Sequence, residues 1–213
     1  MNNPFLSLLN RSAAVLLLIS LSSCSYSQVK RVPVDPSEER LNSQHKPEQL
    51  MEVIGLEEGM VIADIGAGRG RMTVFFAFRV GEKGKVLAND IDKYALEYLE
   101  NRCKRNNINN VNTFLGSVTD PMLPEGTADI VFMVSTFHHL EKPVELMRNT
   151  IPCLKPDGRL VIVERDPSKT GQSSNESTSH AEMISQMTEA GYELIRIDTK
   201  LLERDNIYFF KVR

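Results

Sequence analysis

The sequence predicts an α/β protein of the doubly wound class, in which helices cover both faces of a mostly parallel sheet. Apolar runs of strand length alternate with segments of helical periodicity from residue 45 until a closing pair of strands, as in parallel sheets with crossover helices. The run at residues 129–134 is almost continuously apolar, which suits a strand buried on both faces. A glycine-rich turn at residues 66–70 follows the first strand, where open parallel sheets commonly bind nucleotides.

Each element has a local signal. The strands are expected at residues 60–65, 85–90, 111–115, 129–134, 159–163, 192–198 and 207–212. Helices are expected at residues 47–54, 73–80, 93–105, 144–154 and 181–190. Asp92 is a suitable N-cap for the third helix, and Gly55 and Gly191 are suitable stops for the first and last. Residues 155–158 read as a sharp turn and residues 167–179 as a polar loop.

The N-terminus differs from the rest of the chain. Arg11 precedes a short apolar run, and Leu21-Ser22-Ser23-Cys24 follows it. A charged start, a short apolar segment and small residues before a cleavage point are typical of a secretory signal. These four residues also resemble the lipoprotein box of bacteria, in which the cysteine is lipidated. An uncleaved anchor, or a later start at Met51 or another codon, is the alternative.

This reading divides the chain into a signal peptide at residues 1–23, a lipid-anchored polar tether at 24–44 and a domain at 45–213. A lipidated Cys24 would hold the domain at a membrane surface without a spanning helix, on the periplasmic or cell-envelope side. The inner face of the cytoplasmic membrane is the alternative, because Lys30 and Arg31 balance Arg11 across the apolar run.

Composition excludes some partners. The chain has 25 basic and 28 acidic residues, a net charge of -3 and no long basic block, so we expect no nucleic acid partner. No His/Cys cluster has metal-ligand spacing, and no metal is expected. Cys103 and Cys153 are expected to be buried free thiols, although two cysteines in an exported chain could pair.

The glycine turn suggests the kind of ligand. Gly66, Gly68 and Gly70 are spaced one residue more tightly than in the dinucleotide fingerprint, and Asp64 stands two residues before them. A carboxylate there disfavours a diphosphate and favours a cation. Asp90 ends the second strand at the separation expected for a carboxylate that binds ribose hydroxyls. The turn therefore predicts a site for a nucleoside with positive charge and no phosphate.

Several motifs together resemble the class I S-adenosylmethionine-dependent methyltransferases, and more narrowly the small ubiquinone-biosynthesis-like group. They are Asp64-Ile65-Gly66-Ala67-Gly68-Arg69-Gly70, Asp90-Ile91-Asp92, the strand 128–134, Phe137-His138-His139-Leu140 and Leu154-Lys155-Pro156-Asp157-Gly158-Arg159-Leu160. The resemblance covers roughly residues 45–213. It implies a Rossmann-like sheet of seven strands with the last antiparallel, and S-adenosyl-L-methionine as the cofactor.

The resemblance also implies roles for individual residues. The residues implied to contact the cofactor are Asp64, Gly66, Ala67, Gly68, Asp90, Ile91, Ser117, Val118 and Val134. The chain departs from the family in three places, of which Asp157-Gly158 in place of the usual Gly-Gly before the fifth strand is the mildest. Gly116-Ser117 stands where many relatives have Gly-Asp, so the adenine contact passes to Ser117, Val118 or another group. Arg69 stands where smaller or polar residues are common, beside an expected cationic ligand.

Catalytic candidates lie after the fourth and fifth strands. Methyl transfer from a sulfonium depends mainly on in-line positioning and desolvation, and a base is needed only when the acceptor carries a proton. His138, His139 and Glu164 are the candidates for that base, and the histidine pair has a structural role as its alternative. Asp166, His45 and His180 rank behind them.

The sequence therefore predicts a methyltransferase that acts on a small-molecule acceptor. An exported domain would be separated from S-adenosylmethionine, which is made in the cytoplasm. The alternative function is therefore a catalytically inactive, membrane-tethered module that binds a nucleoside or another small ligand. A nicotinamide-dependent oxidoreductase is disfavoured by the spacing of the glycines.

Overall fold

The computed structural model describes residues 32–171 and 179–213, and residues from Val32 onward form one compact unit. The signal peptide and Cys24 lie outside the described residues and stay predictions. In the described part of the chain, no helix is long and apolar enough to cross a membrane.

Seven strands form a single sheet in the order β3-β2-β1-β4-β5-β7-β6. They are β1 (Val61–Ile65), β2 (Lys85–Asp90), β3 (Val111–Leu115), β4 (Ala128–Val134), β5 (Leu154–Arg165), β6 (Tyr192–Asp198) and β7 (Asp205–Val212). β1 to β5 pair in parallel, whereas β7 is antiparallel to β5 and β6. The predicted class, a mostly parallel sheet of seven strands with the last antiparallel, is confirmed.

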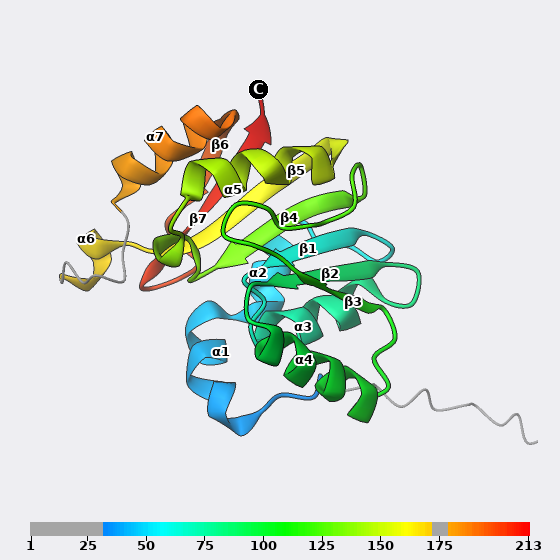
Figure 1. Cartoon of the computed structure of the whole chain (residues 1–213). Helices are drawn as coiled ribbons and strands as arrows, with labels where there is room; N and C mark the ends of the chain where they lie inside the picture. Colours follow the sequence, from blue (N-terminus) through cyan, green and yellow to red (C-terminus); the bar gives the residue numbers. More distant parts are fainter. Residues whose placement is uncertain (1–31, 172–178) are drawn as a thin grey trace, which may run out of the picture. The chain divides into compact units, whose positions relative to one another are not determined.

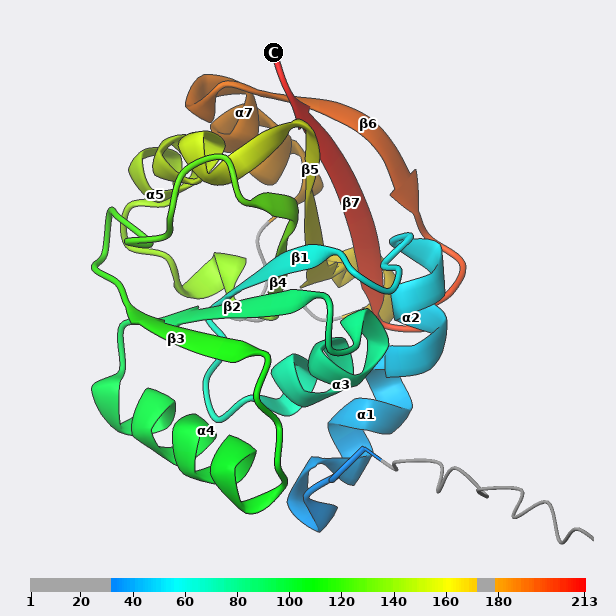
Figure 2. The same cartoon turned by 90° about the vertical axis from the view of Figure 1, so that its right-hand side faces the viewer.

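Helices cover both faces of this sheet (Figure 1). They are α1 (Glu39–His45), α2 (Pro47–Val53), α3 (Arg71–Val80), α4 (Lys93–Arg105), α5 (Pro143–Thr150), α6 (Pro167–Thr170) and α7 (His180–Ala190), with 3₁₀ turns η1 (Pro36–Glu38), η2 (Phe137–His139) and η3 (Ile151–Cys153). The helices α2, α3 and α4 pack in one hydrophobic cluster, and α5 and α7 pack in a second on the opposite face. Figure 2 shows the same layers turned by 90°.

Strand alternation assigns the residues of β5 to the two clusters. Val161 and Val163 belong to the cluster of α3, while Leu160 and Ile162 belong to the cluster of α5 and α7. All four are fully buried, because successive side chains of a strand point to opposite faces and both faces are covered. By the same alternation, Glu164 continues the row on the side of α5 and α7.

Two element boundaries differ from the expectation. The helix expected at 144–154 ends at Thr150, and η3 follows, because Pro152 has no N–H to continue the helical hydrogen bonds and its ring clashes with the carbonyl four residues earlier. The turn expected at 155–158 lies inside β5, where the pairing with β4 shifts register between Ala128 and Ile130. The amine of Lys155 is 2.7 Å from both carboxylate oxygens of Asp129 at this irregularity.

Residues 32–44, which were expected to belong to a polar tether, are part of the folded unit and include η1 and most of α1. Arg102 on α4 is 4% exposed and holds this segment in place. Its guanidinium donates to both carboxylate oxygens of Glu38 at 2.7 and 2.9 Å, and to the carbonyl of Pro33 at 2.9 Å. A bidentate arginine–carboxylate pair of this kind fixes geometry as well as charge.

Gly70 is the N-cap residue of α3, at a point where this helix meets α4. Its φ is +84°, and a Cβ at this position would lie 2.2 Å from Cδ1 of the fully buried Leu99. We expect Gly70→Ala to lower the free energy of unfolding by about 2 kcal/mol, because it adds both backbone strain and overpacking. Urea unfolding measures the change. Gly171→Ala, at φ +66° with no atom within 4 Å of the added Cβ, is the control for backbone strain alone, and an equal loss in both would contradict the packing argument.

Candidate functional site

The glycine turn is tied to the end of β2 by its backbone. Gly66 and Ala67 both donate N–H groups to the carbonyl of Asn89 at 2.9 Å, and Gly68 donates to the carboxylate of Asp90 at 2.7 Å. Gly66 and Gly68 have φ of +72° and +55°, a region that glycine adopts without steric strain. The turn therefore holds its shape through contacts with β2, next to the carboxyl ends of the parallel strands.

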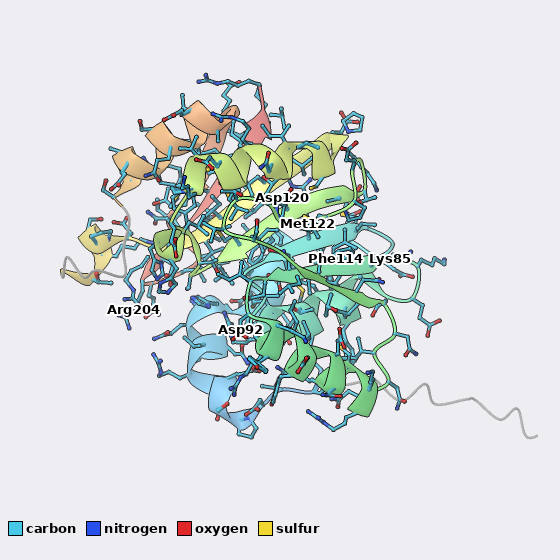
Figure 3. All side chains as sticks on the ribbon, in the orientation of Figure 1. Lys85, Asp92, Phe114, Asp120, Met122 and Arg204 are labelled. Atoms are coloured by element: carbon cyan, nitrogen blue, oxygen red, sulfur yellow. The ribbon has the colours of Figure 1, made fainter. Side chains whose placement is uncertain are left out.

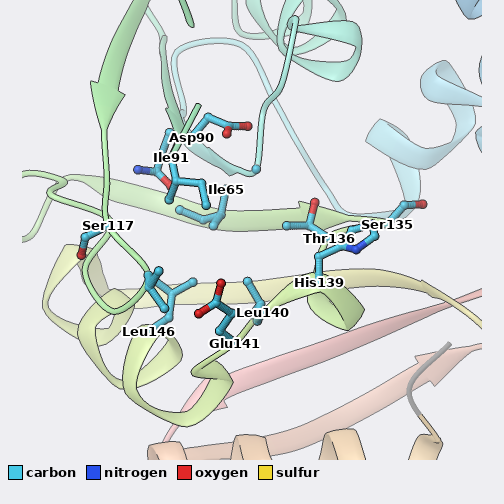
Figure 4. Close-up of a pocket in the computed structure, with 13 residues that line it drawn as sticks. Ile65, Asp90, Ile91, Ser117, Ser135, Thr136, His139, Leu140, Glu141 and Leu146 are labelled. Atoms are coloured by element: carbon cyan, nitrogen blue, oxygen red, sulfur yellow. The ribbon is translucent and has the colours of Figure 1, made fainter. Parts of the chain in front are cut away.

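A cavity of about 330 Å³ lies at these carboxyl ends, within the size range of small-molecule sites. The predicted cofactor residues that line it are Gly66, Asp90, Ile91, Ser117 and Val118. Figure 4 shows Ser117 and Leu146 at one end of the cavity, and Thr136, Ser135 and His139 at the other. The structure thus brings together residues from four separate loops.

Four predicted cofactor residues do not line this cavity: Asp64, Ala67, Gly68 and Val134. Asp64 is 2% exposed, and one of its carboxylate oxygens accepts a hydrogen bond of 2.7 Å from the hydroxyl of Thr73. Burial raises the pKa of Asp64 to about 6, against the lowering effect of Thr73 and of Arg71. Asp64 thus joins the end of β1 to α3 in the interior of the domain.

Asp90 is placed to accept further hydrogen bonds. One carboxylate oxygen accepts from Gly68 N–H at 2.7 Å, and the other accepts from Asp92 N–H at 2.9 Å. An ionised carboxylate has about four acceptor sites, so each oxygen retains one for a ligand. Ile91 beside it is 62% exposed and lines the cavity, which offers an apolar surface to a flat ring.

Arg69 does not project into the cavity. Its guanidinium carbon lies 5.1 Å from the centroid of the Tyr98 ring on α4, within the range of a cation–π contact. The positive charge of Arg69 is therefore directed toward α4, and it leaves the space beside Gly68 open. No atom lies within 4 Å of the position that a Cβ on Gly68 would take.

Several cavity residues were missed in the sequence. They are Asn89, Ser135, Thr136, Leu140, Glu141 and Leu146. Asn89 is 4% exposed, and its amide donates to the carbonyls of Pro121 at 2.8 Å and Phe114 at 3.2 Å. A polar residue inside an otherwise apolar strand was the signal that could have identified it, because buried amides require partners.

The amide of Asn89 secures the connection between β3 and β4, which leaves the carboxyl end of β3 and returns along the sheet to the start of β4 (Figure 1). Asp120 and Met122 belong to this connection (Figure 3), and Met122 is 61% exposed with φ of +54°. In the same loop, the hydroxyl of Ser117 accepts hydrogen bonds from the N–H groups of Thr119 and Asp120 at 3.3 and 3.0 Å. Ser117 therefore shapes the loop as well as lining the cavity.

The predicted catalytic residues divide into two environments. His139 is exposed and lines the cavity, whereas the side chains of His138 and Glu164 are 9% and 1% exposed. Nδ1 of His138 lies 2.8 Å from Oε1 of Glu164. The rings of His138 and His139 are in contact, with centroids 4.0 Å apart. Burial raises the pKa of the Glu164 carboxyl, against the lowering effect of His138.

His45 lies apart from these residues, on the side of α3. Its Nδ1 is 2.8 Å from the guanidinium of Arg71, and its Nε2 is 3.6 Å from the carboxylate of Asp205. Burial, together with the charges of Arg71 and Arg165, lowers the pKa of His45 to about 3. His45 is therefore a neutral imidazole that accepts from Arg71, which disfavours a role as a base. His180 instead lies against the ring of Tyr208, with centroids 5.5 Å apart.

Comparison with known proteins supports the same class. Residues 63–162 match the family described as "Methyltransferase domain". The chain is 28% identical over 111 residues to the ubiquinone/menaquinone biosynthesis C-methyltransferase UbiE of Idiomarina loihiensis, and 28% identical over 115 residues to that of Azotobacter vinelandii. These matches cover 52% and 54% of this chain, and 44% and 46% of the relatives, so the chain spans less than half the length of the curated relatives it matches.

Solved structures agree with the fold. A SAM-dependent methyltransferase from Aquifex aeolicus has a TM-score of 0.75 at 26% identity, and the match covers 84% of this chain and 94% of that one. The geranyl diphosphate C-methyltransferase of Streptomyces coelicolor, solved with S-adenosyl-L-homocysteine, has a TM-score of 0.66 at 17% identity, with 82% of each chain covered. Together with the cavity, these matches support a methyltransferase domain, and the family description and the Aquifex structure point to S-adenosylmethionine as the cofactor.

Proposed function

We propose that this protein is an S-adenosylmethionine-dependent methyltransferase that acts on a small-molecule acceptor. The observation that carries the proposal is the cavity at the carboxyl ends of β1, β2 and β4, with the free acceptor sites of Asp90 at its edge. The inactive, membrane-tethered alternative gains no support from the cavity or from the relatives.

The residues present fit the cofactor. The free acceptor sites of Asp90 suit the two ribose hydroxyls, and Ile91 suits one face of the adenine. Many members of the family place an acid after β3 to accept from the adenine amino group, and this chain has Ser117 there. Glu141 is a carboxylate on the wall of the same cavity, close to Leu140 and Leu146 in Figure 4. We assign the adenine amino contact to Glu141.

The chain's own residues position the methyl donor and the methyl acceptor. The bound cofactor supplies an electrophilic methyl group on a sulfonium, and a nucleophile in line with it needs little further activation. Ser135, Thr136 and His139 form the end of the cavity opposite Ser117 (Figure 4). Ser135 has φ of +50°, and such strained conformations often occur at functional sites. We assign the transfer step to this end, with His139 available to accept a proton from the acceptor.

Titration calorimetry tests this function. We expect S-adenosylmethionine and S-adenosylhomocysteine to bind with dissociation constants of about 1 to 100 μM, within the usual range for enzyme ligands. NAD is the matched control, since its diphosphate conflicts with the spacing of the glycine turn. The absence of binding by either nucleoside at about 1 mM, the upper end of that range, would overturn the proposal.

A further inference from the structure

Residues 32–45, which we call the strap, run along α3 and α4 ahead of the first strand (Figure 1 and Figure 2). The strap contains η1 and α1, and none of its residues lines the cavity. Three side chains on α3 and α4 nevertheless connect it with the glycine turn, which does line the cavity through Gly66. Each of the three contacts the strap, and each also contacts the turn or directly follows it.

Arg102 on α4 provides the first link. The guanidinium that donates to Glu38 and to the carbonyl of Pro33 in the strap also donates to the carbonyl of Arg69 in the turn, at 3.3 Å. A buried charge is costly unless it is paired and hydrogen-bonded. The strap carboxylate and the turn carbonyl are therefore held by one buried group that requires its partners.

Tyr98 on α4 provides the second link. Its hydroxyl donates to Oδ2 of Asp35 in the strap at 3.4 Å, and its ring receives the guanidinium of Arg69, which belongs to the turn. An arginine beside a cationic ligand is unfavourable unless its charge is directed elsewhere. Tyr98 provides that direction, so the residue that draws Arg69 away from the cavity is one that the strap also contacts.

Arg71, the first residue of α3, provides the third link. It directly follows Gly70, so its backbone continues from the turn. Its guanidinium donates to Oδ1 of Asn42 at 3.1 Å and to Nδ1 of His45 at 2.8 Å, and both partners belong to α1. The strap is therefore joined to the chain immediately after the turn, as well as to Arg69 within it.

These links connect the position of the strap with the shape of the turn. The turn donates the N–H of Gly68 to the carboxylate of Asp90, so its shape affects the group assigned to the ribose. When one segment favours the conformation in which another binds a ligand, the ligand favours docking of the first segment by the same factor. Couplings of this kind are typically about 5- to 150-fold.

We propose that docking of the strap and binding of the cofactor are coupled, so that residues 32–45 regulate the affinity of the cavity without entering it. Withdrawal of the strap from α3 and α4 lowers the affinity for S-adenosylmethionine, and a bound cofactor holds the strap in place. This inference rests on the proposed function, since the cofactor is the ligand of the same cavity.

Hydrogen exchange of the full chain, with and without S-adenosylhomocysteine, tests the coupling without a substitution. Exchange of backbone amides measures local opening. We expect saturating ligand to slow the exchange of residues 39–45 by about 5-fold or more, the lower end of the usual coupling. The helix α7, which packs on the opposite face of the sheet, is the internal control. Equal slowing in α7 would assign the effect to stabilisation of the whole domain and reject the coupling.

Glu38→Gln tests the same coupling from the strap. Glu38 does not line the cavity, and its carboxylate pairs with Arg102, so we expect the variant to bind S-adenosylhomocysteine about 5-fold or more weakly. Glu39→Gln is the matched control, because the next carboxylate is exposed and has no hydrogen bond or ion pair in the described part of the chain. Urea unfolding checks that both variants fold, and the exchange experiment on the wild type decides the question if Glu38→Gln does not.

Three outcomes would overturn the inference: unchanged affinity in a folded Glu38→Gln, an equal loss in Glu39→Gln, or exchange of the strap that the ligand leaves unchanged. Titration calorimetry separates this failure from that of the proposed function. If S-adenosylhomocysteine binds the wild type without slowing exchange of the strap, the proposed function stands and the coupling is wrong. If it does not bind at all, both are wrong.

Discussion

Replacement of Asp90 by alanine is expected to weaken the binding of S-adenosylhomocysteine by about 100-fold or more, which corresponds to about 2.7 kcal/mol. Hydrogen bonds to a charged acceptor contribute roughly 1.5 to 3 kcal/mol each, and Asp90 has two acceptor sites free for the ribose. The substitution also releases the N–H groups of Gly68 and Asp92, so the glycine turn loses one of its supports. Titration calorimetry measures the loss.

Asp198→Ala is the matched control. Asp198 also ends a strand, and its carboxylate accepts from the N–H groups of Lys200 and Leu201 at 2.9 and 3.0 Å, but it does not line the cavity. Binding by Asp198→Ala should match the wild type. If Asp90→Ala binds S-adenosylhomocysteine as tightly as the wild type does, the assignment of Asp90 to the ribose is wrong. If both variants lose affinity equally, the cause is a loosening of the fold and not the loss of a ribose contact.

Asp64 is expected to make the folded protein progressively less stable as the pH rises from about 4 to about 6. Its pKa is raised from 3.8 to about 6 by burial, so the folded state binds more protons than the unfolded state in this window. The free energy of unfolding then decreases with pH wherever the folded state binds more protons. The contribution of protonated Asp64 to stability is fully present below pH 3.8, the pKa of this carboxyl in the unfolded chain. It is lost as the pH rises through about 6, its pKa in the folded protein.

Asp64→Asn isolates this effect, because asparagine does not titrate and its oxygen can still accept from Thr73. We expect the stability of the variant relative to the wild type to rise by up to about 3 kcal/mol between pH 4 and pH 7, since two pKa units correspond to that free energy. Urea unfolding at several pH values measures it. Asp157→Asn, at an exposed carboxylate, should follow the wild type throughout. A difference between Asp64→Asn and the wild type that does not change with pH would show that Asp64 does not titrate in this range.

The order of strands and helices was readable from the sequence, because each element carries a local signal. Burial on both faces makes β4 and the centre of β5 continuously apolar, and glycine alone readily adopts the positive φ of the turn at Gly66 and Gly68. The ends of elements were less readable. The helix α5 stops early because of Pro152, and residues 155–158 join β5 through a register shift, which depends on the neighbouring strand.

The sequence by itself determined the class of fold, the glycine turn and Asp90 as a cavity residue, since these follow from spacing along the chain. Tertiary structure decided which charged groups meet. Arg69 turns toward Tyr98, Arg102 holds Glu38 and Pro33, and Glu164 lies between His138 and Asn206. These partners are separated by roughly 26 to 69 residues, and they meet through strand register and helix packing, which no local pattern encodes. The links between the strap and the glycine turn became visible only once that packing was known.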